Sequence, residues 1–146
     1  MKETRKQLLQ NYLETWHRYV RLIGSEVLCP QNCESIPKSQ LILLYILLEH
    51  RQMTIKQLAE ELHITSSAAT QLVEHVVNLG LAERIETKDD RRQVNVRLTG
   101  EGVRETMQYK ESALIRLEEV MSTVNDTKLS KIIEFQKEIV DNKESK

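Results

Sequence analysis

Hydrophobic positions recur at helical spacing near both ends of the chain. Residues 2–27 place apolar side chains three and four positions apart, which predicts one long amphipathic helix. A second stripe follows Thr99 and runs to Val124, and a third begins at Leu129 and ends at Val140. A small domain cannot easily cover stripes of this length, so they indicate terminal helices that need a partner surface, as in a homodimer.

The longest unbroken apolar run, Leu41 to Leu48, is apolar on every face of a helix. Its leucine richness and polar flanks favour a buried helix at the centre of the domain. Pro37 suits the first turn of that helix. Residues 51–53 are expected to add a short strand beside a later hairpin.

Between positions 54 and 80 the pattern predicts two short helices joined by a turn. Thr54 and Gln57 form the pattern of a capping box, and Thr65 is the next N-cap. His63 and Ile64 are expected to form the turn. Gly80 ends the second helix, since glycine adopts a left-handed backbone at little cost.

A two-residue alternation follows. Val94, Val96 and Leu98 alternate with polar residues, and residues 81–87 form a weaker strand. The segment 88–92 between them has no apolar residue and is expected to be an exposed hairpin tip. Two helices, a turn and a hairpin in this order predict a mainly α fold with a small β-wing, a winged helix-turn-helix with additional terminal helices. This unit typically binds DNA.

Three motifs resemble the MarR family of regulators: L-A-E-E-L from Leu58, G-L-A-E-R from Gly80, and D-D-R-R-Q-V-N-V-R-L-T-G-E-G from Asp89. The resemblance covers roughly residues 37–102 by motif and the whole chain by length and helix order. It implies one domain, 1–146, with a DNA-binding lobe at 37–99. Residues 1–36 and 100–146 would supply dimerisation helices that interlock around a two-fold axis.

The helix from Thr65 to Leu79 is expected to enter the major groove with its N-terminal end leading. Gln71 is the best candidate base reader, because its amide can pair with adenine. His75 could reach a phosphate when protonated. The full set of candidates on this helix is Thr65, Ser66, Ser67, Thr70, Gln71 and His75. A two-fold dimer would place two such helices about 34 Å apart and favour a pseudo-palindromic operator.

That helix contains no Arg or Lys, so most electrostatic affinity must come from the wing. By resemblance, Arg92 is the wing arginine that enters the minor groove, and Asp90 is the acidic residue that orients it. Lys88 and Arg91 would add phosphate contacts.

Cys29 and Cys33 form a C-x-x-x-C segment that has three interpretations. They are two small half-buried residues, or a pair that is oxidised reversibly, or part of a zinc site completed by His17 or His50. The resemblance also implies a pocket for a small-molecule effector, with Trp16, Tyr19 and Tyr45 as candidate lining residues.

The formal net charge of −1 does not by itself indicate a nucleic-acid binder. No apolar run approaches the roughly 20 residues that span a bilayer, so we expect a soluble cytoplasmic protein without membrane contact. No motif predicts a cofactor or an enzyme. The leading hypothesis is a homodimeric transcriptional repressor that binds double-stranded DNA and responds to a small ligand or thiol oxidation. The alternative is a winged helix that contacts other proteins and not DNA.

Overall fold

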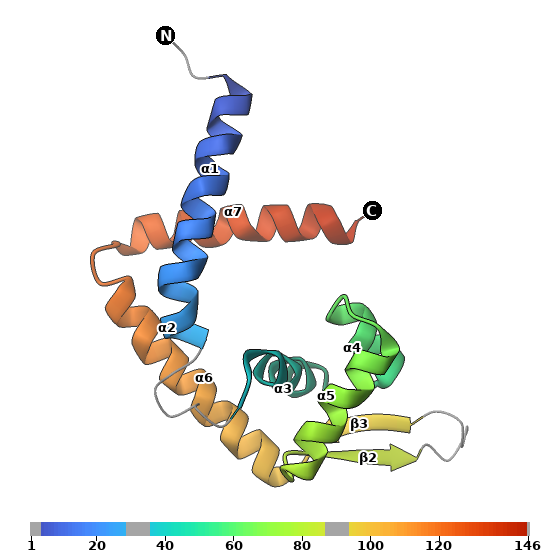
Figure 1. Cartoon of the computed structure of the whole chain (residues 1–146). Helices are drawn as coiled ribbons and strands as arrows, with labels where there is room; N and C mark the ends of the chain where they lie inside the picture. Colours follow the sequence, from blue (N-terminus) through green and yellow to red (C-terminus); the bar gives the residue numbers. More distant parts are fainter. Residues whose placement is uncertain (1–3, 29–35, 87–93, 146) are drawn as a thin grey trace.

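The computed structural model describes residues 4–28, 36–86 and 94–145, and it places a winged-helix lobe at one end of the molecule (Figure 1). The lobe consists of α3 (Lys38–His50), β1 (Gln52–Thr54), α4 (Ile55–Glu61), α5 (Ser66–Asn78), β2 (Ala82–Glu86) and β3 (Val94–Leu98). Its flanking elements are α1 (Arg5–Tyr19), η1 (Val20–Gly24), α2 (Ser25–Leu28), α6 (Gly100–Val120) and α7 (Asp126–Glu144). The predicted fold class, mainly helical with a small β-wing, is confirmed.

Helix α3 forms the centre of the lobe, as its apolar run predicted. Pro37 occupies the N-cap and not the first turn, so the helix begins one residue later than expected. Leu43 and Leu44 are completely buried, but Ile42 is 41% exposed. The side that carries Ile42 is left uncovered, because the packed neighbours α5, α6 and the sheet lie against the other sides of the helix.

The sheet is antiparallel with the order β1-β3-β2, so β3 is the central strand. Val96 pairs with Met53 on one side and with Arg84 on the other. Val96 and Leu98 are buried while Arg97 is exposed, which is the predicted alternation. The predicted third strand is also present, one residue further along than expected.

The N-terminal helix begins later than predicted and changes its winding. Thr4 forms a capping box with Gln7: the Gln7 amide donates to Thr4 Oγ1 at 3.3 Å, and Thr4 N donates to Gln7 Oε1 at 2.8 Å. Five residues of π-helix, η1, then separate α1 from the short α2. Gly24 lies at the end of this turn, where low helix propensity favours a departure from α-helical winding.

Helices α1 and α7 contain no buried residue. The apolar side chains of α1 between 45% and 56% exposed are Leu8, Leu9, Tyr12, Leu13 and Trp16. Those of α7 between 38% and 52% exposed are Ile132, Ile133, Phe135, Ile139 and Val140. These are the uncovered stripes that the sequence predicted. Among the described helices, none is both long enough and apolar enough to cross a membrane.

The start of α6 is joined to the end of α5 by a compact set of backbone contacts. Gly80 ends α5 with a φ of +74°, as predicted for this position. Thr99 then donates from its amide to the Leu81 carbonyl at 3.0 Å and from its hydroxyl to the Gly80 carbonyl at 2.7 Å. The Thr99 hydroxyl also accepts from Gly102 N at 3.0 Å and so caps α6. One threonine therefore fixes two helix ends against each other.

Gly102 makes this joint possible because it has no side chain. A Cβ at position 102 would lie 1.8 Å from the Leu81 carbonyl oxygen. The next turn adds a buried Thr106, whose hydroxyl donates to the Gly102 carbonyl at 2.6 Å. The glycine of the L-T-x-x-G motif is thus required by close backbone contact.

Replacing Gly102 by alanine should lower the free energy of unfolding by at least about 2 kcal/mol, because the carbonyl that a methyl group would overlap belongs to rigid backbone. Urea unfolding at a fixed protein concentration measures this. Gly100→Ala is the matched control, since a Cβ there meets nothing within 4 Å. We expect the control to leave stability unchanged or to raise it by up to about 1 kcal/mol. Equal effects of the two variants would contradict this account of the joint.

Candidate nucleic-acid interface

Helices α4 and α5 form the predicted helix-turn-helix, and each begins at the predicted cap. Gln57 N donates to Thr54 Oγ1 at 3.2 Å, while Thr54 N donates to Gln57 Oε1 at 2.9 Å. Thr65 Oγ1 accepts from Ala68 N at 3.2 Å. His63 has a φ of +53°, which turns the chain sharply between the two helices. The local hydrogen-bonding pattern that the sequence predicted is confirmed.

Helix α5 lies on the surface of the lobe beside the β2–β3 hairpin (Figure 1). Its buried side consists of Ala69, Val73 and Val76, all with no exposed surface. This burial fixes the rotation of the helix about its axis and turns the polar side outward. The polar residues exposed on that side include the predicted candidates Ser66, Ser67, Gln71 and His75.

The two threonines among the candidates have local roles. The Thr65 hydroxyl accepts the capping hydrogen bond described above. Thr70 is half-buried, and its hydroxyl donates to the Ser66 carbonyl at 2.8 Å. Because each hydroxyl has a single proton, Thr70 can present only its acceptor lone pairs to a ligand. Donors toward a ligand must come from other residues of this helix.

His75 makes a contact that the sequence did not reveal. Its Nδ1 lies 3.1 Å from Nε2 of Gln40, which is on α3 and only 7% exposed. Gln40 shares helical spacing with the buried Leu44 and Leu47, at i+4 and i+7. That spacing was the available signal that this glutamine faces the interior and not solvent.

One ion pair connects the hairpin to α5, and another connects the two strands of the hairpin to each other. Arg84 on β2 lies 3.5 Å from Glu74 on α5, with both side chains about half exposed. Arg97 Nε donates to Glu83 Oε1 across the β2–β3 pair at 2.7 Å. Exposed pairs of this kind stabilise weakly. Their main consequence is electrostatic, since Arg84 offsets the one acidic group on the outer side of α5.

The predicted wing residues Lys88, Asp90, Arg91 and Arg92 lie outside the described residues. The strands that lead to them end at Glu86 and Val94, which are partners in the antiparallel register. The hairpin itself is therefore confirmed, and the roles of its four tip residues stay predictions.

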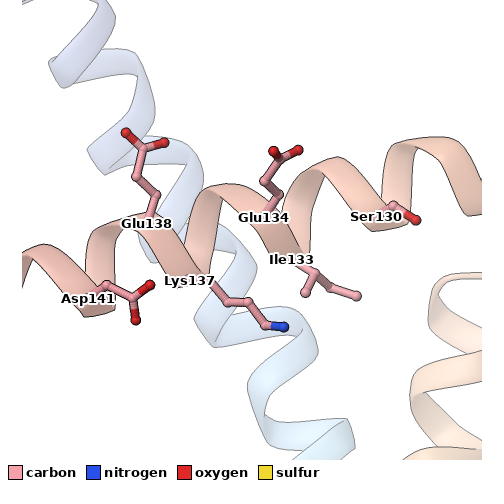
Figure 2. Close-up of a pocket in the computed structure, with 6 residues that line it drawn as sticks. All are labelled: Ser130, Ile133, Glu134, Lys137, Glu138 and Asp141. Carbon is pink, nitrogen blue, oxygen red and sulfur yellow. The ribbon is translucent and has the colours of Figure 1, made fainter.

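The candidate pocket residues separate into two groups. On α1, Trp16 stacks on Tyr19 with ring centroids 6.2 Å apart and on Tyr12 at 6.3 Å. Tyr45, by contrast, packs against the hydrophobic core of the lobe. Figure 2 shows a shallow hollow along α7, which is lined by Ser130, Ile133, Glu134, Lys137, Glu138 and Asp141. None of the three aromatic candidates lines this hollow, and their role as pocket residues stays a prediction.

Cys29 and Cys33 also lie outside the described residues, so the choice among their three interpretations stays open. The two histidines considered as zinc ligands are on separate elements, His17 on α1 and His50 at the end of α3. Within the described ranges, no three His, Cys, Asp or Glu side chains are grouped as metal ligands would be.

The sequence comparisons agree with the motifs. The family model described as the MarR family matches residues 35–93. The organic hydroperoxide resistance transcriptional regulator of Bacillus subtilis (strain 168) is 31% identical over 68 residues. These residues are 47% of this chain and 46% of that protein, so the match spans about half the length of the curated relative.

Solved structures resemble the whole chain. A MarR family protein from Bacillus stearothermophilus superposes with a TM-score of 0.77 at 23% identity, covering 100% of this chain and 99% of that one. The transcriptional regulator BldR from Sulfolobus solfataricus gives 0.78 at 20% identity, covering 96% and 99%. A mutant of MarR from E. coli, complexed with operator DNA, gives 0.72 at 19% identity, covering 88% and 93%. The winged-helix stretch 35–93 therefore matches the MarR family model, and the solved structures share the fold of the chain along its length.

Proposed function

We propose that this chain is a sequence-specific transcriptional regulator that binds double-stranded DNA. The observation that carries the proposal is the exposed polar side of α5, held outward by buried Ala69, Val73 and Val76 next to the hairpin. The curated relative is named as a transcriptional regulator, and one similar structure is a complex with operator DNA. The N-terminal end of α5 also offers free backbone amides to a phosphate.

The proposed DNA-binding unit is a homodimer. A single copy leaves the apolar sides of α1 and α7 largely exposed, with Leu13 at 53% and Ile139 at 45%. Contiguous apolar surface of this extent is unusual on a monomer and favours an interface. A second copy supplies a matching surface by two-fold symmetry. The same symmetry presents two α5 helices to successive major grooves of a pseudo-palindromic site.

The regulator acts as a repressor whose operator affinity changes with an effector. Bound at a promoter, a dimer of this size occupies DNA that polymerase needs. The effector is either a small molecule or an oxidant that acts through Cys29 and Cys33. The curated relative is named for organic hydroperoxide resistance, which supports including an oxidant among the effectors to be tested.

A selection from random-sequence duplexes tests the proposal. The full chain is mixed with the pool, bound duplexes are recovered, and affinity is measured against salt with thiols reduced and then oxidised. Enrichment of one palindromic sequence, bound with a steep salt dependence, supports the regulator. Loss of this binding on oxidation assigns sensing to the cysteines, and unchanged binding assigns it to a ligand. The absence of any enriched sequence would reject DNA recognition in favour of a protein-contact module.

Replacing Leu13 by lysine should convert the dimer to monomers. Each dimer would bury two unpaired ammonium groups, so we expect its dissociation constant to rise about a hundredfold or more. Sedimentation equilibrium reports the mass, which for a monomer is 17.1 kDa. Leu79→Lys is the control, because Leu79 is similarly exposed, at 51%, but lies at the end of α5. A dimer that tolerates Leu13→Lys would place the interface elsewhere.

Replacing Gln71 by alanine should weaken binding to the selected duplex by about tenfold or more per half-site, because a bidentate contact to a base is lost. Binding to an unrelated duplex and the salt dependence should not change, since Gln71 is uncharged. Titration of both duplexes measures the specificity ratio. Gln108→Ala, on an exposed position of α6, controls for loss of an amide. Equal weakening on both duplexes would show that Gln71 is not a base reader.

Replacing Arg92 by alanine should weaken binding to every duplex and reduce the slope of log affinity against log salt by about one unit per subunit. Arginine in a narrow minor groove is strongly favoured, so affinity is lost with the charge. Arg5→Ala is the charge-matched control, since this exposed residue begins α1, away from the hairpin. Identical slopes for wild type and Arg92→Ala would exclude a DNA contact by the wing arginine.

A further inference from the structure

The contact between Gln40 and His75 places a side-chain amide beside one nitrogen of the imidazole ring. Nε2 of the glutamine is an amide nitrogen, which carries two protons and has no lone pair to offer. Gln40 Nε2 and His75 Nδ1 lie 3.1 Å apart, and a hydrogen bond donated by the amide to Nδ1 requires that Nδ1 carries no proton. A neutral ring bound in this way carries its proton on Nε2. Among the described residues, no ion pair involves His75.

The contact with Gln40 orients the His75 ring, because one partner is buried and the other is exposed. Gln40 is buried on α3, so its amide has little freedom to follow a moving ring. His75 is exposed on α5, and in an imidazole the two nitrogens point away from each other. Nε2–H therefore points away from Gln40. His75 lies one helical turn beyond Gln71 on the same side of α5, since residues four apart share a side of a helix.

We propose that Gln40 is a positioning residue for DNA binding, which holds His75 as an uncharged hydrogen-bond donor beside Gln71. The inference rests on the proposed function and adds a residue that does not itself touch DNA. It also replaces the protonated phosphate contact expected of His75. The partner on DNA is a hydrogen-bond acceptor, which is either a base-edge atom in the major groove or a phosphate oxygen.

An uncharged donor differs from a cation in its response to salt. A cationic contact releases about one counterion, and its removal lowers the salt slope by about one unit per subunit. A neutral imidazole releases none. His75→Ala should therefore weaken binding by about tenfold, the effect of one hydrogen bond, with the slope unchanged at pH 7.5. Weakening confined to the selected duplex identifies a base acceptor, and equal weakening on an unrelated duplex identifies a phosphate.

Gln40 should act only through His75, and a double-mutant cycle shows this. We expect Gln40→Leu, which keeps the side-chain volume, to weaken binding about threefold to tenfold in the wild-type background. The same substitution in the His75→Ala background should cause no further loss, because the ring that Gln40 holds is absent. A substitution that merely tilted α5 would cost the same in both backgrounds. Gln108→Leu on α6 is the control for glutamine loss.

The ring can also be observed directly. Nitrogen-15 spectra of the free protein distinguish a protonated from an unprotonated imidazole nitrogen. We expect unprotonated Nδ1 and protonated Nε2 in wild type, and a mixture of tautomers in Gln40→Leu. A protonated Nδ1 in wild type, additive losses in the cycle, or a reduced slope in His75→Ala would each overturn the inference while leaving DNA binding intact. Absence of specific binding by the wild-type chain would instead reject the proposed function, and the inference with it.

Discussion

The close approach of α6 to the Leu81 carbonyl is the contact on which the arrangement of the lobe depends. Gly102 permits it, and Thr99 secures it by bonding to the backbone of both Gly80 and Leu81. Through these few atoms the end of α5 is attached to the start of a 21-residue helix. A rotation of α6 is therefore transmitted to α5 with little loss, because backbone contacts do not repack as side chains do.

Local features of the fold were predictable because their causes lie within a few residues. The caps at Thr54 and Thr65 and the left-handed Gly80 are short-range hydrogen-bonding and steric effects, and all were found where expected. The contact between Gln40 and His75 spans 35 positions and depends on how α3 crosses α5, which periodicity does not encode. The winding of η1 was missed for a similar reason, since one glycine does not specify a π-turn.

The exposure of the candidate residues on α5 was predictable from the sequence, but their side-chain contacts were not. Burial of Val73 and Val76 followed directly from the apolar stripe, and it determines that Gln71 is exposed. The apolar stripe could not show that the Thr70 hydroxyl donates to the Ser66 carbonyl. It also could not show that Arg84 forms an ion pair with Glu74. The positive charge of Arg84 offsets the negative charge of Glu74, so the proposed recognition by α5 depends mainly on neutral hydrogen bonds. Such a helix discriminates bases better than it attracts phosphates.

The uncovered sides of α1 and α7 also bear on how the cell would set the activity of this protein. In the proposed homodimer, which would cover them, the amount of assembled protein rises as the square of the chain concentration whenever the chain is scarce. Occupancy of an operator would then follow synthesis and degradation more steeply than for a monomer. A modest change in expression would suffice to switch a promoter, before any effector binds.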